Sequence, residues 1–336
     1  MDILICGSPR SGNTLVANII GSHSNAAVPS GNIFFWTLVY YKFGNQLFDK
    51  NNFQLIETIE SKIGEAYLNF NKNQMKELAE CMANGSEVNV KRLIDCSLSI
   101  YKSSKRKFIA GVKDPGAERY TKEILNMYPK CKIVHVVRDP FSVIASKKTS
   151  LGGDIASNID PIYLTQLKEC MLLSIHNKSV YPNNYHVVKY EDIVKDPSET
   201  INQMCIFLNL EYQEEMLQMS GNKDWNELWK GTNSSFDKDS FRGISKVALD
   251  RKEYLSDFEK YYIANKFSAL MKLYDYEFPI KYKVFKVIYL KPLAVLFLIQ
   301  LIRISFKPIR SLSSFLGLDS FVRKTWSYFK KITSVV

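Results

Sequence analysis

The sequence predicts a three-layer α/β fold in which a central parallel sheet is flanked by helices. Two observations lead to this prediction. Short apolar runs that are typical of buried strands alternate along the chain with longer stretches of helical spacing. The 336 residues are 46% hydrophobic and 24% charged, which is the composition of a globular protein long enough to bury a sizeable core.

The first strand, loop and helix stand at the N-terminus. Ile3–Cys6 is a short apolar run that ends at Gly7, as a buried parallel strand does. The stretch from Asn13 to Ser22 follows with helical spacing. No basic segment with a long apolar run precedes the strand, so we expect neither secretion nor an N-terminal membrane anchor.

The remaining elements continue the alternation. Residues 32–107 have mainly helical spacing, most clearly over 52–70 and 87–101. Further strands are expected at 108–112, 133–137 and 185–190, a helix opens over 142–147, and another spans 197–208 with Pro197 in its first turn. The sequence therefore predicts one domain over residues 1–280, with 32–107 as a helical insertion.

Residues 281–336 differ from the rest of the chain in charge. They hold eleven Lys and Arg against one acid, Asp319, and carry +10 of the net charge of +11. Their uncharged run, 292–302, is shorter than the roughly 20 apolar residues of a spanning helix. The pattern favours a basic amphipathic helical tail on an anionic membrane surface, with a helix packed on the body as the alternative. Nucleic acid is not expected as a partner.

The cysteines are widely spaced and form no CxxC pair: Cys6, Cys81, Cys96, Cys131, Cys170 and Cys205. This spacing predicts neither a zinc site nor a disulfide framework, so we expect buried free thiols in a reducing compartment. No other ligand cluster indicates a metal. The expected location is the cytoplasm, at the periphery of the inner membrane face.

The segment Gly7-Ser8-Pro9-Arg10-Ser11-Gly12-Asn13-Thr14 is the strongest motif. Its glycines allow a tight turn, and its amides with the following helix N-terminus form an anion site. Arg10 adds a positively charged guanidinium, whose N–H groups can donate several hydrogen bonds to one anion. The spacing is that of nucleoside-triphosphate loops, but Asn13 stands where those loops have the lysine that contacts the β- and γ-phosphates. This difference argues against triphosphate chemistry.

A second motif follows the strand at 133–137. Arg138 comes directly after this strand, at the sheet edge where ligands bind in open α/β folds. Pro140 presets the first turn of the next helix, and Ser146 lies two turns into it. A guanidinium and a hydroxyl in this arrangement suit one phosphate. The alternative is a salt bridge of Arg138 and a surface serine.

Both motifs resemble those of the P-loop-type PAPS-dependent sulfotransferases, in particular the carbohydrate, Golgi-like and bacterial members (PAPS is 3′-phosphoadenosine 5′-phosphosulfate). The resemblance covers residues 1 to about 278. It implies that the 5′-phosphosulfate is held by Ser8, Arg10, Ser11, Gly12, Asn13, Thr14 and Leu15. It implies that Arg138 and Ser146 bind the 3′-phosphate and, from the fainter Phe241-Arg242-Gly243, that Arg242 contacts the nucleotide.

Two further segments resemble the family more weakly. Gly111-Val112-Lys113-Asp114-Pro115 resembles a Lys-Thr/Asp-Pro segment, and Tyr190-Glu191-Asp192-Ile193 resembles a mostly structural stretch. The resemblance implies that Arg10 and Lys113 act on the transferring group, with a surface ion pair as the alternative role of Lys113.

The catalytic base is not where the family has it. Many carbohydrate-type members have a glutamate in Pro-x-Glu-Thr-x-Phe, and the corresponding stretch from Pro29 to Phe34 has Gly31 at the glutamate position. Asp114 and His23 are the substitutes by location. The alternatives are that Asp114 holds Arg138 or a helix N-terminus and that His23 caps a helix end.

The function that these expectations imply is transfer of a sulfuryl group from PAPS to a hydroxyl or amine, without a metal. A carbohydrate or glycolipid acceptor is favoured over another small molecule. The aromatic residues between Phe34 and Phe43 either line the acceptor site or, by default, pack in the core. The competing functions are a P-loop nucleotide kinase or phosphotransferase and a non-catalytic membrane-surface protein that keeps the nucleotide-binding fold.

Overall fold

The computed structural model describes residues 1–45, 47, 68, 70–84, 88–149, 160–219 and 254–277. The chain forms two compact units. The first comprises Met1–Arg138 and Glu169–Leu249, and the second comprises Asp139–Lys168 and Asp250–Val336. The predicted boundary near residue 280 and the predicted tail 281–336 lie outside the described residues, so that division of the chain stays a prediction.

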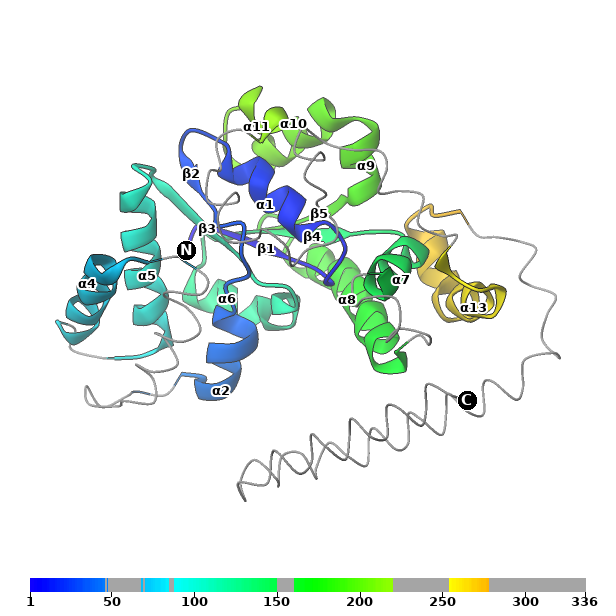
Figure 1. Ribbon diagram of the computed structural model, residues 1–336, viewed down its shortest axis with the longest axis horizontal. Coiled ribbons are helices and arrows are strands. Elements are labelled where there is room, and N and C mark those ends of the chain that lie inside the picture. Colours follow the sequence, from blue (N-terminus) through cyan, green and yellow to red (C-terminus); the bar gives the residue numbers. More distant parts are fainter. Residues whose placement is uncertain are drawn as a thin grey trace, which may run out of the picture. The chain divides into compact units, whose positions relative to one another are not determined.

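The first unit is built on five parallel strands in the order β2-β3-β1-β4-β5 (Figure 1). The strands are β1 (Ile3–Cys6), β2 (Ala26–Ala27), β3 (Ile109–Lys113), β4 (Lys132–Val137) and β5 (Tyr185–Lys189). The chain first adds strands on one side of β1 and then on the other. The predicted fold, a central parallel sheet flanked by helices, is confirmed, and β1 lies at the point where the strand order reverses.

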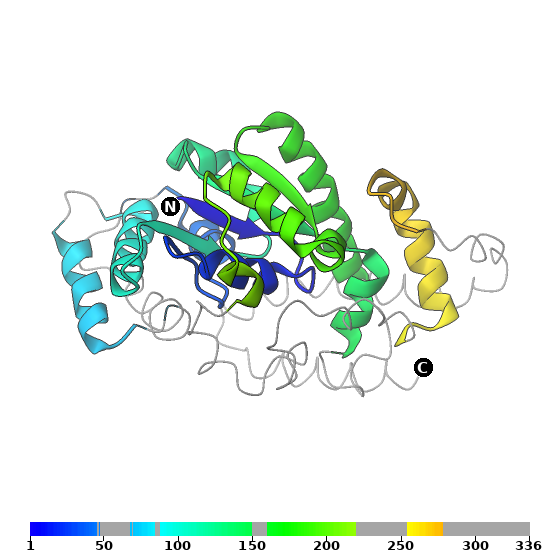
Figure 2. The ribbon, with the colours of Figure 1, turned by 90° about the horizontal axis from the view of Figure 1, so that it is seen from above.

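Both faces of the sheet are buried, because the side chains of a strand alternate between them. Ile3 and Ile5 of β1 pack in one cluster with residues of the helices that follow β1 and β5. Leu4 and Cys6 face a second cluster with the helical insertion. Helices cover both faces of the sheet (Figure 1 and Figure 2), and this two-sided cover explains why β1 is entirely apolar.

The helices of the first unit alternate with the strands as predicted, and three of those described follow the last strand. They are α1 (Asn13–Gly21), the π-helical turn η1 (Phe35–Tyr40), α2 (Tyr41–Phe43), α4 (Lys72–Ala83), α5 (Val90–Ser104), the 3-10 turn η3 (Ala117–Tyr120), α6 (Thr121–Met127), α9 (Tyr190–Lys195), α10 (Pro197–Leu208) and α11 (Glu215–Gln218). The helix α8 (Pro161–Val180) belongs to the first unit from Glu169 onward. Most of the helical prediction over 52–70 lies outside the described residues.

Three strands differ from their predicted bounds by one residue, and one strand was not predicted; β4 begins at Lys132 rather than at 133, and β5 ends at Lys189 rather than at 190. β3 begins at Ile109 rather than Phe108, whose side chain is 79% exposed and lies before the ladder. β2 was not predicted, because two alanines have neither the length nor the β-branched character of a strand. Its pairing of Ala26 with Ile109 exists only because β3 offers an edge.

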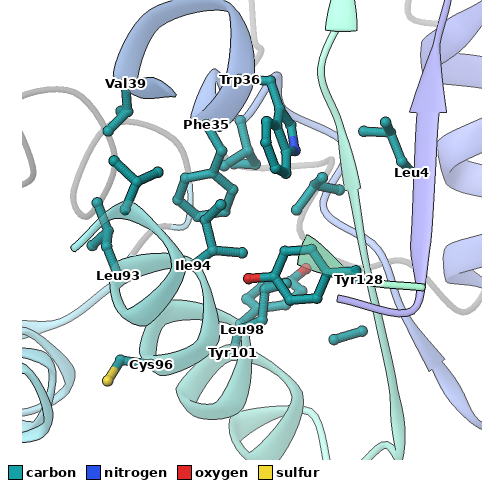
Figure 3. Close-up of a cluster of buried hydrophobic side chains, with 14 of the residues drawn as sticks. Leu4, Phe35, Trp36, Val39, Leu93, Ile94, Cys96, Leu98, Tyr101 and Tyr128 are labelled. Atoms are coloured by element: carbon teal, nitrogen blue, oxygen red, sulfur yellow. The ribbon is translucent and has the colours of Figure 1, made fainter. Parts of the chain in front are cut away.

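The described part of the helical insertion is packed around aromatic side chains. Phe35 and Trp36 are fully buried against α5, and the Trp36 ring meets Tyr128 edge-on at 6.5 Å between centroids (Figure 3). Tyr41, by contrast, is 75% exposed. Packing in the core therefore accounts for Phe35 and Trp36, as the default interpretation of this aromatic group had it.

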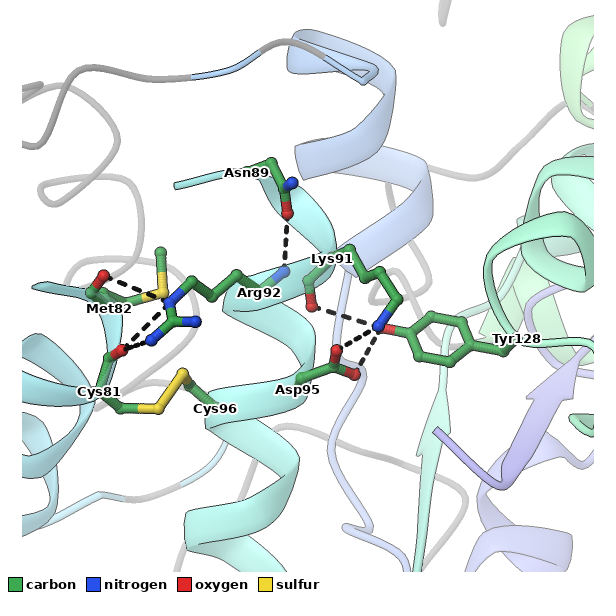
Figure 4. The surroundings of a disulfide bond; sticks show 8 residues. All are labelled: Cys81, Met82, Asn89, Lys91, Arg92, Asp95, Cys96 and Tyr128. Carbon is green, nitrogen blue, oxygen red and sulfur yellow. Dashed lines mark hydrogen bonds and ion pairs between the residues drawn. A yellow bond between two sulfur atoms is a disulfide. The ribbon is translucent and has the colours of Figure 1, made fainter. Parts of the chain in front are cut away.

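The prediction that all six cysteines are free thiols is wrong. Cys81 of α4 and Cys96 of α5 form a disulfide, with their Cα atoms 6.0 Å apart (Figure 4). The two helices lie side by side, and Arg92 of α5 donates hydrogen bonds to the carbonyl oxygens of Cys81 and Met82 at the end of α4. A spacing of 15 residues gave no sign of this contact, because it arises only when the two helices pair. The other four cysteines are free and buried.

The second unit is described for α7 (Pro140–Thr149), the start of α8 and α13 (Asp257–Leu273). The Asp139 carboxylate accepts hydrogen bonds from the backbone N–H and the hydroxyl of Ser142, and so caps the first turn of α7. Lys148 of α7 pairs with the buried carboxylate of Glu259 on α13 at 3.0 Å. The Asp139 cap agrees with a start of α7 at Pro140, two residues before the predicted start.

Candidate active site

The loop between β1 and α1 has a backbone shape that only glycine permits at two positions. Gly7 and Gly12 have φ angles of +127° and +106°. A Cβ atom on Gly7 would lie 2.4 Å from the carbonyl oxygen of Val136, and one on Gly12 would lie 2.5 Å from the ring of Tyr190. Arg10 also has positive φ, at 73°. The loop is therefore a tightly packed turn at the carboxyl edge of the sheet, with the N-terminus of α1 directly after it.

The side chain of Asn13 holds the loop in its conformation by hydrogen bonds to the loop backbone. Its side-chain amide donates to the carbonyl oxygens of Gly7 and Ser8, at 3.1 and 3.0 Å. The side chain is buried and turned back onto the loop. A lysine at this position of a triphosphate loop reaches the phosphates instead, so the structure gives a physical reason for the sequence-based argument against triphosphate chemistry.

Lys113, the last residue of β3, places its side chain beside the start of α1. The ammonium group of Lys113 donates to the hydroxyl of Thr14 at 2.7 Å and to the carbonyl oxygen of Ser30. The side chain is 3% exposed, which excludes the alternative role in a surface ion pair. Burial lowers the pKa of Lys113 to about 7. Lys113 thus lies beside the first turn of α1, where an anion would bind.

Asp114 serves as a helix cap. Its carboxylate accepts hydrogen bonds from the backbone N–H groups of Trp36 and Thr37, at 2.7 and 3.2 Å, and from the Thr37 hydroxyl at 2.5 Å. Burial raises the pKa of Asp114 to about 7, although these hydrogen bonds lower it. Of its predicted roles, the geometry favours holding a helix N-terminus and argues against a catalytic base.

His23 lies at the far end of α1 from the loop. Its Nε2 hydrogen-bonds the carbonyl oxygen of Glu211 at 3.0 Å, and its Nδ1 accepts from the N–H of Asn25 at 3.0 Å. Both ring nitrogens are therefore engaged by backbone groups, one directly after α1 and one after α10. This arrangement argues against His23 as the base and fits the alternative of a residue at a helix end.

The segment around Gly31 approaches the same place without an acid. The carbonyl oxygen of Ser30 accepts the hydrogen bond from Lys113, and the N–H of Ile33 donates to the carbonyl of Lys113 at 2.8 Å. Gly31 lies between these contacts. The family's glutamate position thus lies next to the contacts of Lys113, and it offers no side chain.

Arg138 ends the first unit at the carboxyl end of β4. Its guanidinium stacks over the ring of Tyr190 at 4.2 Å from the centroid and donates to the carbonyl oxygen of Arg10 at 3.3 Å. The Arg138 side chain is 5% exposed, and its hydrogen bond to Arg10 connects it to the loop between β1 and α1, called the phosphate loop below. Ser146 lies in α7 of the second unit, so its pairing with Arg138 stays a prediction. Arg242 lies outside the described residues.

The sequence analysis missed Glu118 at this edge, and it named Tyr190 only within a mostly structural stretch, without its contact with the loop. The Tyr190 ring packs under Gly12 and under Arg138. The carboxylate of Glu118 accepts a hydrogen bond from the N–H of Gly7 at 3.3 Å. Both follow the carboxyl end of a strand, β5 and β3, and that position was the available signal. Their contacts with the loop depend on strand order, which the sequence did not specify.

The described residues contain no group of three or more His, Cys, Asp or Glu side chains arranged to hold a metal ion. Among the same residues, no helix combines the length and the apolar character needed to cross a bilayer.

Comparison with known proteins points in one direction. A family model described as "Sulfotransferase family" matches residues 2–214. A protein of Caenorhabditis briggsae, named as a candidate protein-tyrosine sulfotransferase, is 23% identical over 220 residues, which cover 64% of this chain and 68% of that protein. An uncharacterized protein of Aquifex aeolicus (strain VF5) is 24% identical over 224 residues, which are 64% of this chain but 26% of the longer relative.

Solved structures share the fold. The sulfotransferase domain of the Synechococcus PCC 7002 olefin synthase superimposes with a TM-score of 0.58 at 16% identity, covering 83% of this chain and 95% of that domain. The sulfotransferase domain of the curacin biosynthetic pathway gives a TM-score of 0.56 at 19% identity, covering 83% and 98%. At these identities the likeness concerns the fold alone.

Proposed function

Because the chain belongs to the sulfotransferase family, we propose that it transfers a sulfuryl group from PAPS to an acceptor hydroxyl or amine, without a metal. The observation that carries the proposal is the contact of Lys113 with Thr14. It brings a buried cation to the N-terminus of α1, beside the glycine loop. Cation, loop amides and helix terminus together suit the anionic 5′-phosphosulfate end of the donor.

In the proposed reaction the acceptor atom attacks sulfur in line with the leaving phosphate oxygen. The new bond to sulfur forms as the sulfur–oxygen bond to the nucleotide breaks, and the electron pair of that bond stays on the 5′-phosphate. Lys113, Arg10 and the amides at the start of α1 stabilise this growing negative charge. Asn13 keeps the loop in shape through its hydrogen bonds to Gly7 and Ser8.

The acceptor loses a proton in this reaction, and neither the family's glutamate position nor the two predicted substitutes, Asp114 and His23, supplies a group placed to take it. Gly31 lacks a side chain, Asp114 caps η1, and His23 lies at the other end of α1. We therefore assign Asp114 a positioning role and leave the proton to solvent or to a group on the acceptor side.

For the acceptor we propose a carbohydrate or glycolipid. The next candidate acceptors are a small molecule with a free hydroxyl and a tyrosyl peptide. The peptide is considered because the Caenorhabditis briggsae relative is named as a candidate protein-tyrosine sulfotransferase. Residues 281–336 are proposed to lie on an anionic membrane surface, on the strength of their net charge of +10. A cytoplasmic location stays a prediction, and the Cys81–Cys96 disulfide weighs against it because such bonds persist in oxidising compartments.

Calorimetric titration with 3′,5′-adenosine bisphosphate (PAP), the desulfonated product, tests the proposal. We expect binding at micromolar concentration by the wild type, loss of binding in Arg138→Ala, and no binding of ATP with Mg²⁺. Lys132→Ala is the matched control, since Lys132 lies at the opposite end of β4 and bonds the carbonyl of Asn183. Tight ATP binding without a PAP signal would instead support the nucleotide kinase.

A further inference from the structure

A buried carboxylate lies behind the phosphate loop. Glu118 of η3 is 2% exposed, and its Oε2 accepts the hydrogen bond from the N–H of Gly7. The N–H of Gly7 is therefore directed to the protein interior and not to the anion site. A buried backbone N–H without an acceptor is costly in free energy, so this bond fixes the direction in which the loop leaves β1.

Glu118 is itself held firmly in place. Its carbonyl oxygen accepts hydrogen bonds from the Thr121 hydroxyl at 2.8 Å and from the side-chain amide of Asn177 at 2.9 Å. The guanidinium of the next residue, Arg119, forms its ion pair with Glu169 at 2.9 Å. The nearest cation in sequence thus forms its ion pair with another acid, and the Glu118 side chain keeps its contact with the Gly7 N–H.

The charge of Glu118 acts on the groups around the start of the loop. Burial raises the pKa of the Cys6 thiol, and the Glu118 carboxylate raises it further. The same two causes, in the same order, raise the pKa of Cys170, on α8. Cys6 immediately precedes Gly7, so the negative field that opposes a thiolate there also opposes an anion bound at the loop.

We propose that Glu118 is a positioning residue with two opposite effects on the nucleotide. Its hydrogen bond holds Gly7 in the conformation that the loop needs to bind the donor. Its negative charge, placed behind the loop, weakens the binding of the anionic nucleotide and so favours release of the product. The inference rests on the proposed function, because it needs an anionic nucleotide in the loop.

The two effects are separable by substitution. In Glu118→Gln the amide oxygen still accepts from the Gly7 N–H while the charge is removed, so PAP binds about fivefold more tightly. In Glu118→Ala both are lost, and the Gly7 N–H has no acceptor, so PAP binds about tenfold more weakly. A purely structural role would make both variants bind more weakly, in proportion to their loss of packing.

The experiment is PAP titration of the full chain by calorimetry, with the dissociation rate of PAP measured by stopped flow. Glu80→Gln is the control, since it removes an exposed carboxylate of α4 that pairs with Lys76 and leaves the contacts of Glu118 and Arg119 in place. Opposite changes in the dissociation constant for Gln and Ala, slower dissociation for Gln, and no change in the control support the inference.

Equal weakening in both Glu118 variants, or no change in Glu118→Gln, overturns it. Where Glu118→Ala fails to fold, the tighter binding expected of Glu118→Gln decides alone. Failure of the wild type to bind PAP would count against the proposed function, whereas normal wild-type binding with unchanged variants would count against Glu118 only.

Discussion

The phosphate loop and the α4–α5 pair are held together in different ways. The loop is fixed by buried contacts: two glycines packed against Val136 and Tyr190, and hydrogen bonds from Asn13 and to Glu118. The α4 helix buries only Leu78 and Met82 among its twelve residues. It is joined to α5 by the Cys81–Cys96 disulfide and by Arg92 (Figure 4).

This difference teaches where specificity and stability reside. At the loop, close approach of neighbouring atoms requires glycine at positions 7 and 12, so one added carbon atom at either position is expected to disturb the site. In the α4–α5 pair, a covalent bond replaces extensive packing, so its loss is expected to lower stability and leave the nucleotide site unchanged. The predictions below test this division, from the largest expected effect to the smallest.

The largest effect is expected for Gly7→Ala. The added Cβ would meet a backbone oxygen at 2.4 Å in a conformation that L residues rarely adopt. Strain and overpacking together should lower the free energy of unfolding by about 4 kcal/mol and abolish PAP binding. Chemical denaturation and calorimetry measure both quantities. Gly44→Ala is the control, because Gly44 also has positive φ but nothing within 4 Å of the added atom; equal losses in both variants would contradict the role of close packing.

Removal of the disulfide should have the next largest effect. In the Cys81→Ser/Cys96→Ser variant, opening a loop of this length should lower the free energy of unfolding by about 3 kcal/mol, with the dissociation constant of PAP unchanged. Denaturation with and without reductant measures the effect, since reductant should destabilise only the wild type. Alkylation of the unfolded wild type should find four free thiols, whereas six would show that the expectation of a fully reduced chain was correct.

The smallest effect concerns the pH dependence of nucleotide binding. The pKa of Lys113 is lowered to about 7 by burial, and the anionic nucleotide favours the charged form. PAP affinity should therefore fall by up to about tenfold per pH unit above pH 7, with proton uptake on binding, and Lys113→Met should abolish the trend. Calorimetry in buffers of different ionisation enthalpy counts the protons, and affinity that rises with pH would contradict the prediction.

The same lowered pKa has an opposite consequence for the empty protein. An unfolded lysine titrates near 10.5, so between about pH 7 and 10.5 the unfolded chain binds more protons than the folded one. The contribution of Lys113 therefore makes the empty protein more stable as the pH rises through this window.

The sequence by itself determined the parallel sheet, the glycine loop before α1, and the arginine at the end of β4. These features depend on local rules: buried strands are apolar, a tight turn needs glycine, and a helix N-terminus attracts anions. The same local character made the family resemblance visible, and the family model later matched residues 2–214.

Only the tertiary structure decided which distant residues meet the loop. Lys113 reaches Thr14 across 99 positions and Glu118 reaches Gly7 across 111, because β3 pairs beside β1. Burial then sets their chemistry: it lowers the pKa of Lys113 and engages Asp114 as a cap. Cys81 and Cys96 likewise pair only when α4 packs on α5. Contacts of this kind depend on strand order and helix packing, which residue spacing along the chain does not encode.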